Sequence, residues 1–222
     1  MCSSDLAAVN DAPVVSDAGG TLDYNEGDGA QVIDADLTLT DVDNTDLESA
    51  TVTISSGFQS DQDVLAFTNT AEITGSWDSV NGILTLTGPA TLAQFEAALE
   101  SVTYENTNTD QPDTGNRTIS WVVNDGALDS AVGVTSVVTV AAVNDAPVVS
   151  DAGGTLTYAE GDGAQVIDAT LTITDVDDTD LAQATVSITG GFVDSEDVLA
   201  FTDTAEITGS WDSVNGILTL TG

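Results

Sequence analysis

Short stretches in which apolar and polar residues alternate dominate the chain. The alternation is clearest in six runs rich in Val, Ile, Leu and Thr, each bounded by Gly, Asp or Asn. These runs cover residues 31–39, 50–54, 63–68, 83–86, 118–123 and 132–140. Because side chains point alternately to the two faces of a strand, this period of two predicts β-strands. Residues 73–86 predict a hairpin, in which Asn81-Gly82 supplies a tight turn with left-handed torsions.

One segment departs from this alternation and predicts a helix. Thr91-Leu92-Ala93-Gln94 has the pattern of a capping box, and Leu92, Phe95 and Leu99 follow at helical spacing. We predict a single short helix over residues 92–100 that covers the end of a sheet.

A long internal repeat sets the domain organisation. Residues 7–88 recur without a gap as residues 141–222, and only 15 of the 82 paired positions differ. A repeat of this length is a whole domain, and tandem copies are typical of arrays that span distance. The first copy continues through residues 89–140, and the second has no counterpart of that segment. We therefore predict a complete repeat over 7–140 and a C-terminally truncated repeat over 141–222, joined by a linker at residues 143–147.

The six residues that precede the repeat have a different character. Met1-Cys2-Ser3-Ser4-Asp5-Leu6 resembles the translation of a common short-read sequencing adapter. We predict that residues 1–6 are an assembly artefact, to be left out of fold reasoning. The only Met and the only Cys of the chain then fall outside the native sequence, and no disulfide is expected.

The charge narrows the classes of function. The chain has 38 acidic residues, one basic residue (Arg117) and no His, which gives a net charge of −37. Such a chain repels itself unless cations bind or salt screens the charge, and it has no basic patch for nucleic acid. No apolar stretch approaches the ~18 residues that span a bilayer. Without His, Lys or a native thiol we predict no enzyme, although a carboxylate pair of the glycosidase type is an alternative.

Acidic residues recur at matching places in the two copies. Asn10-Asp11 returns as Asn144-Asp145, and Asp41-Val42-Asp43 returns as Asp175-Val176-Asp177. Ca²⁺ prefers six to eight oxygen ligands, and an Asp-x-Asp in a loop places two carboxylates on one side of the backbone. The motif therefore predicts a calcium site, with solvated acidic loops as the alternative. Arg117 is expected to pair with a nearby Asp.

The order of these motifs resembles a known layout. Asn-Asp-Ala-Pro, Glu26, Thr40-Asp41-Val42-Asp43, Val123-Asn124-Asp125-Gly126 and a second Asn-Asp-Ala-Pro follow one another as in cadherins. The chain is most similar to the cadherin-like tandem repeats of giant bacterial (RTX-type) surface adhesins, over nearly all of residues 7–222. The resemblance implies an all-β fold of tandem Ig-like or cadherin-like antiparallel β-sandwiches, each with one short helix, the second one truncated.

The same resemblance implies where Ca²⁺ binds. Residues implied at the junction between the two repeats are Glu26, Asn144, Asp145, Asp175 and Asp177. Residues implied in the matching site of the first repeat are Asn10, Asp11, Asp41, Asp43 and Asp125. Glu105 lies where cadherins carry an Asp-Arg-Glu motif; that motif is absent here, so Glu105 is not assigned and the number of ions stays open.

These inferences lead to one expected function and two alternatives. We expect a stalk module of a large bacterial surface or secreted adhesin, outside the cell, in which calcium stiffens the array. Its partners would be calcium, neighbouring repeats of the same chain, and a cell-surface or matrix ligand bound by domains outside this sequence. The alternatives are a salt-adapted acidic repeat without specific ion sites, and a carbohydrate- or ligand-binding module that uses Trp77 and Trp211.

Overall fold

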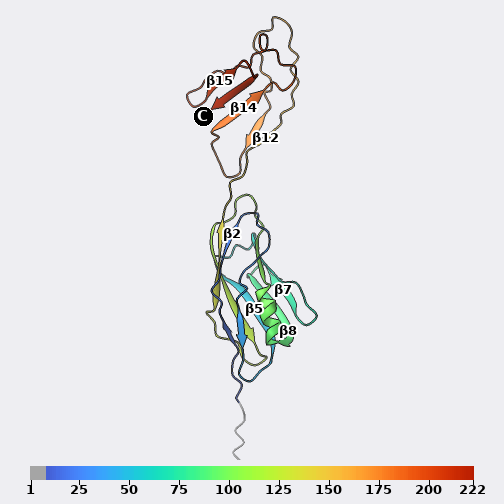
Figure 1. The fold of residues 1–222 in the computed structure, drawn as a ribbon, viewed down its shortest axis with the longest axis vertical. Helices are drawn as coiled ribbons and strands as arrows, with labels where there is room; N and C mark the ends of the chain where they lie inside the picture. The colour runs from blue at the N-terminus through green and yellow to red at the C-terminus, as the bar shows by residue number, and fades with distance from the viewer. Residues whose placement is uncertain (1–8) are drawn as a thin grey trace, which may run out of the picture. The chain divides into compact units, whose positions relative to one another are not determined.

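A computed structural model describes residues 9–222 of the chain. It divides into two compact units, the first ending at Val143 and the second running from Asn144 to Gly222 (Figure 1). The division falls inside the segment that we expected to be a linker. The predicted artefact at residues 1–6 lies outside the described residues.

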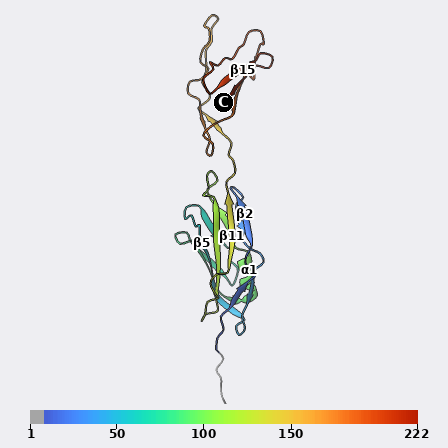
Figure 2. The ribbon, with the colours of Figure 1, turned by 90° about the vertical axis from the view of Figure 1, so that its left-hand side faces the viewer.

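The first unit is built from eleven strands and one helix (Figures 1 and 2). Short β-branched runs bounded by Gly, Asp and Asn form these strands, as the alternation predicts. In chain order they are β1 (Val14–Ser16), β2 (Thr21–Asn25), β3 (Gln31–Val32), β4 (Thr38–Thr40), β5 (Asp46–Ser56), β6 (Asp63–Ala66), β7 (Thr74–Asp78), β8 (Ile83–Thr91), α1 (Leu92–Glu100), β9 (Thr103–Asn106), β10 (Gly115–Asn124) and β11 (Thr135–Ala141).

The strands form one large sheet and two small ones. The large sheet has the order β2-β11-β10-β5-β8-β7, and the small sheets are β3-β9-β6 and β1-β4. The predicted all-β sandwich fold is confirmed, with one qualification. β11 runs parallel to β2, with Val137 opposite Thr21, whereas the other strand pairs are antiparallel.

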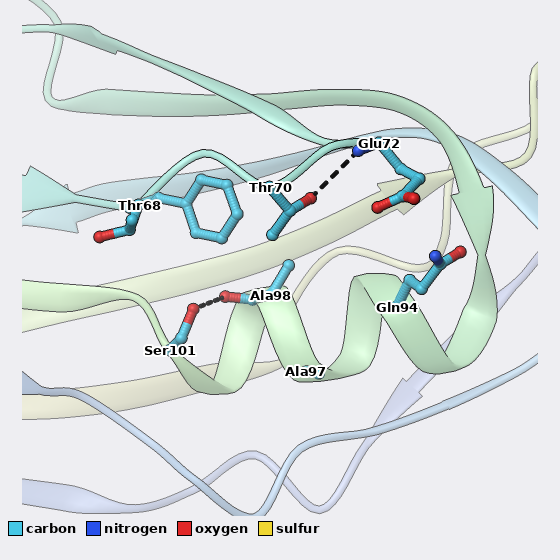
Figure 3. A pocket seen from close by; sticks show the side chains of 8 residues that line it. Thr68, Thr70, Glu72, Gln94, Ala97, Ala98 and Ser101 are labelled. Carbon is cyan, nitrogen blue, oxygen red and sulfur yellow. Dashed lines mark hydrogen bonds between the residues drawn. The ribbon is translucent and has the colours of Figure 1, made fainter.

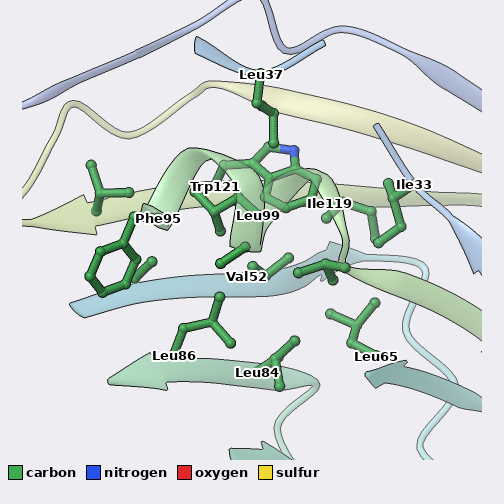
Figure 4. Close-up of a cluster of buried hydrophobic side chains, with 14 of the residues drawn as sticks. Ile33, Leu37, Val52, Leu65, Leu84, Leu86, Phe95, Leu99, Ile119 and Trp121 are labelled. Atoms are coloured by element: carbon green, nitrogen blue, oxygen red, sulfur yellow. The ribbon is translucent and has the colours of Figure 1, made fainter. Parts of the chain in front are cut away.

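The predicted helix is confirmed over Leu92–Glu100, together with its capping box. Thr91 Oγ1 accepts a hydrogen bond from the Gln94 backbone, and Gln94 Oε1 accepts one from the Thr91 backbone. α1 contacts β4, β5 and β8 and turns Phe95 and Leu99 into the core. Figure 4 shows these two side chains in one apolar cluster with Trp121 of β10, which is fully buried.

The strand predicted over residues 31–39 is interrupted. Only Gln31–Val32 and Thr38–Thr40 are strands, because Asp34 bends the chain between them. Its buried carboxylate accepts hydrogen bonds from Ser136 Oγ at 2.6 Å and from the backbone N–H groups of Gly20 and Asp36. A side chain that bonds neighbouring backbone competes with the strand ladder. β1, β2 and β9 lie outside the six predicted runs.

The predicted hairpin forms between β7 and β8, but the turn is longer than we expected. Its loop covers residues 79–82, and only Gly82 has a positive φ, at 69°. Asp78 Oδ1 accepts hydrogen bonds from the backbone N–H groups of Val80 and Asn81, which stabilises this wider loop.

The second unit contains five strands. They are β12 (Val148–Ser150), β13 (Thr172–Thr174), β14 (Gln183–Ser187), β15 (Thr208–Asp212) and β16 (Ile217–Thr221). β12 pairs with β13, and the other three form a sheet in the order β14-β16-β15. Contrary to the expectation of a helix in each repeat, residues 144–222 contain none, because the residues that match α1 do not occur in this unit.

Candidate functional site

Four of the five residues predicted for the site of the first repeat are joined in a chain of hydrogen bonds at one end of that unit. The Asp11 backbone N–H donates to Asp43, whose own N–H donates to Asp41 Oδ1 at 3.1 Å. Asn44 joins the same group: its N–H also donates to Asp41 Oδ1, and its Nδ2 donates to Asn10 Oδ1 at 3.0 Å. The loop after β4 and the segment before β1 therefore meet here.

Asp125, the fifth predicted residue, reaches the same cluster from the turn after β10. Asn10 Nδ2 donates to Asp125 Oδ2 at 2.7 Å, across 115 residues of sequence. This hydrogen bond, followed by those from the backbone N–H groups of Leu128 and Ala127, lowers the pKa of Asp125 to about 2. We call this group of six residues, Asn44 included, the acidic end of the first unit.

One carboxylate oxygen of the acidic end takes no part in the hydrogen-bond network. Asp41 Oδ2 is shielded from solvent and accepts no hydrogen bond from the described residues. A shielded carboxylate oxygen without a partner loses the hydration that stabilises its charge. The carboxylate and amide oxygens of the acidic end are of the kind that a hard cation such as Ca²⁺ prefers.

The second unit builds the corresponding cluster from Asp175, Asp177 and Asp178. A carboxylate oxygen of each lies within 4.8 Å of one from the other two. The Asp145 N–H donates to Asp177 Oδ2 at 3.1 Å, and the Asn144 side chain donates to the Asp145 carbonyl. Four predicted residues therefore gather in this unit. Desolvation favours the neutral form of Asp175, but the hydrogen bond that it shares with the Asp177 side chain and those from the backbone N–H groups of Asp178 and Asp177 outweigh this effect, so the pKa of Asp175 is lowered.

Glu26 lies in the first unit, at the turn after β2. Glu26 Oε2 accepts a hydrogen bond from the Val143 N–H at 2.9 Å, and the Glu26 N–H donates to the Ala141 carbonyl. Its second oxygen, Oε1, is shielded and has no partner among the described residues. A site that joins Glu26 to Asn144, Asp145, Asp175 and Asp177 stays a prediction. Glu105 lies on β9, opposite Val64 of β6.

The sequence did not point to Asn44 and Asp178, which occupy matching positions of the two repeats. Both follow the Asp-x-Asp motif directly, and both offer an oxygen donor although the residue differs. Preservation of a donor at a variable position was the signal that could have found them.

Asp63, in the segment Asp61-Gln62-Asp63, has a structural role instead. Its carboxylate is fully buried and pairs with Arg117 Nε at 3.1 Å, as expected for the only basic side chain. Tyr104 OH donates to Asp63 Oδ1 at 2.6 Å, and Asn106 Nδ2 donates to the same oxygen. Burial and the hydrogen bond to Asp63 raise the pKa of Tyr104 above its ordinary value. The group fixes β6, β9 and β10 together.

The two tryptophans of the alternative ligand site are half-buried. Trp77 packs edge-to-face against Phe58, and Trp211 packs in the same way against Phe192, with ring centroids 6.2 and 6.1 Å apart. Trp77 also contacts the apolar core.

A shallow pocket lies between α1 and the segment from Phe67 to Glu72 (Figure 3). The Ser101 hydroxyl donates to the Ala98 carbonyl, and Thr70 Oγ1 accepts from the Glu72 N–H. The lining residues include one carboxylate, Glu72, and no thiol or amine. This pocket has no pair of groups suited to acid–base chemistry.

Within residues 9–222, no helix is long and apolar enough to cross a membrane. No family model matches the chain. A stretch of 101 residues, 43% of the chain, is 37% identical to part of halomucin from Haloquadratum walsbyi. The matched stretch covers about 1% of the length of that protein. A module of this kind therefore also occurs within a much larger protein, and this match does not test the resemblance to the RTX-type adhesins.

Proposed function

We propose that this chain is a structural repeat module of a large surface or secreted protein. We also propose that the acidic end of the first unit and the cluster of Asp175, Asp177 and Asp178 in the second unit hold Ca²⁺. The observation that carries the proposal is the acidic end of the first unit, where three Asp and two Asn side chains converge with the Asp11 backbone. The chain offers these oxygens from three segments far apart in sequence, which solvated acidic loops do not require.

The calcium part of the proposal follows from charge and ligand chemistry. Asp41, Asp43 and Asp125 would supply carboxylate oxygens, and the shielded Asp41 Oδ2 would gain the partner that it lacks. Asp175, Asp177 and Asp178 would act in the same way in the second unit. Bound Ca²⁺ supplies positive charge that relieves repulsion among the carboxylates, so that binding free energy becomes folding free energy.

The mechanical part concerns the linker. Glu26 accepts a hydrogen bond from Val143, and Asp145 donates one to Asp177, so two residues of the linker contact acidic side chains. Calcium at these residues would restrict the linker and stiffen a tandem array. The surface or extracellular setting is supported by the partial match to a protein whose name describes a mucin. The proposal assigns no reaction to the chain.

The match also favours a second candidate, a salt-adapted acidic module without specific ion sites. The name halomucin refers to salt, and a net charge of −37 is screened by any concentrated electrolyte. In this candidate the acidic ends are solvated, and Ca²⁺ acts only through ionic strength.

Calorimetric titration of Ca²⁺ into the 222-residue chain at about 150 mM KCl tests the proposed sites. We expect saturable binding that Asp41→Asn with Asp43→Asn weakens at least tenfold, about 1.4 kcal/mol per site. The matched control is Asp110→Asn with Asp113→Asn, which removes the same charge from an exposed loop. Equal loss in both variants, or no saturable binding, would count against specific sites.

Small-angle scattering tests the mechanical part separately. We expect the radius of gyration of the chain to change between millimolar Ca²⁺ and chelator at constant ionic strength, and Asp175→Asn with Asp177→Asn to remove that change. An identical radius in both conditions would refute the stiffening of the linker while leaving calcium binding itself intact.

A further inference from the structure

The strands of the second unit form only where their partners lie within the repeated residues. β12 pairs with β13 in the register of β1 with β4, and β14-β16-β15 keeps the registers of β5-β8-β7. The residues that match β2, β3 and β6 are not strands in this unit. In the first unit β2 pairs with β11, and β3 and β6 pair with β9. All three missing strands therefore lack partners that residues 89–141 supply in the first unit.

The apolar residues of the second unit are exposed at the positions that this segment covers in the first. Tyr24 is 1% exposed and its match Tyr158 is 59% exposed; the values are 2% and 46% for Leu37 and Leu171. Leu218, by contrast, lies within the retained sheet and stays buried. We call the exposed set, Tyr158, Ile167, Leu171, Ile173 and Leu181, the open face of the second unit.

Two acidic side chains beside the open face are set to receive polar groups. Asp168 matches Asp34, and Oδ2 of each accepts hydrogen bonds from two Gly backbone N–H groups. Asp34 Oδ2 also accepts one from Ser136, whereas the hydroxyl that bonds Asp168 is that of Thr170 and bonds Oδ1. Asp197 matches Asp63 and accepts from the Val193 N–H, as Asp63 accepts from Gln59. Tyr104 and Arg117, which complete the bonds of Asp63, both belong to residues 89–141.

The place of the helix is also open. A hollow of about 380 Å³ is lined by Ile173, Thr174, Asp175, Asp178, Thr179 and Leu181. At the matching position of the first unit, the Leu92 N–H at the start of α1 donates to the Thr45 carbonyl, and Glu96 of α1 accepts from the Leu39 N–H. Thr45 and Leu39 match Thr179 and Ile173, which both line the hollow. The hollow therefore corresponds to the site where α1 packs in the first unit.

We propose that the open face is the docking surface for a polypeptide segment of the same kind as residues 89–141. Such a segment supplies a helix for the hollow, strands for the three unformed edges, a serine for Asp168, and an arginine with a tyrosine for Asp197. Gly222 matches Gly88, from which the first unit continues into residues 89–141, so a segment joined by design at Gly222 has the connection of the first unit. The inference does not depend on calcium.

The test extends the 222-residue chain by a copy of residues 89–141 placed after Gly222. Hydrogen exchange is followed in peptides that cover residues 155–166 and 197–200. We expect exchange there to slow by at least about tenfold relative to the original chain, because new strand ladders form. The matched control carries Phe95→Asp and Leu99→Asp in the appended copy only, and we expect it to lose the slowing.

A second variant tests whether the arginine of the appended copy pairs with Asp197. Arg117→Gln in the appended copy should restore faster exchange around residues 197–200 while the slowing around 155–159 persists. The proposal is overturned if the extended chain exchanges as fast as the original, or if the Phe95→Asp/Leu99→Asp control is slowed equally. It is also overturned if the original chain is already slow in a way that grows with protein concentration, because a second copy then covers the open face.

Discussion

Leu47 and Leu181 occupy matching positions of the repeat, yet the first is buried and the second is 37% exposed. Their neighbours within the repeated sequence are nearly the same, so the difference arises from residues 89–141, which only the first unit has. Local pairs such as β1-β4 and β12-β13 form in both units with one register. The comparison teaches that strand pairs form in both units where both partners lie within the repeated residues, whereas burial also requires residues outside the repeat.

The largest expected difference between the units concerns the buried ion pair. Arg117→Met leaves the carboxylate of Asp63 buried without its cation, so we expect a loss of about 3–5 kcal/mol in the free energy of unfolding of the first unit. Asp197→Asn, at the matching acidic position, should change stability by less than about 0.5 kcal/mol. Urea unfolding followed by tryptophan fluorescence measures both. Equal effects would mean that the pair is not what separates the units.

Truncation of the matched leucines gives the next effect. Leu47→Ala should cost the first unit about 2–5 kcal/mol through lost burial and a residual cavity. Leu181→Ala should cost less than about 1 kcal/mol, because its side chain is already partly in water. Peptide-resolved hydrogen exchange of each unit provides the measurement. A loss of stability in Leu181→Ala as large as that in Leu47→Ala would show that the side chain of Leu181 is covered in solution.

Two matched glycines separate backbone strain from packing. Gly57 and Gly191 have φ of 75° and 73°, but only at Gly57 would an added Cβ clash with the Asn116 carbonyl oxygen. Gly191→Ala should cost about 1 kcal/mol from the left-handed backbone alone. Gly57→Ala should cost about 2–4 kcal/mol, because the clash with β10 adds to that strain. Thermal unfolding measures both losses of stability. Equal losses in Gly57→Ala and Gly191→Ala would show that the close approach of β10 to Gly57 does not contribute.

The smallest effect is on pH dependence. Asp125 has a pKa lowered to about 2 from 3.8, so its ionised form stabilises the first unit above about pH 4, and this contribution is lost as pH falls toward 2. Asp125→Asn should make the stability of the first unit less sensitive to acid over this range. The second unit, which has no residue that matches Asp125, should not respond. Unfolding curves at pH 5 and pH 2.5 for both chains check this.

Sequence patterns predicted the helix and most strands because these depend on local signals. The capping box at Thr91 and Gln94 fixed the start of α1, and periodicity fixed its apolar face. The continuous strand over residues 31–39 was wrong because Asp34 bonds Ser136, which is 102 residues away. No local pattern reports a bond of that span.

The candidate site shows the same division. The Asp-x-Asp motif pointed to Asp41 and Asp43, and the order of motifs placed Asn10 and Asp125 with them, as the structure does. The role of Asp63 could not be predicted, because its partner Arg117 lies 54 residues away on another strand. Asn44 was missed because an amide between acidic residues carries little signal by itself.

The stability of the first unit in Ca²⁺ and in Na⁺ tests the proposed function most directly. Thermal unfolding of the 222-residue chain would be compared in about 5 mM CaCl₂ and in NaCl of matched ionic strength. A calcium site predicts an unfolding temperature several degrees higher in Ca²⁺, and predicts that Asp41→Asn with Asp43→Asn removes this difference while Asp110→Asn with Asp113→Asn keeps it. The same unfolding temperature in both salts would contradict specific calcium binding and favour the salt-adapted module.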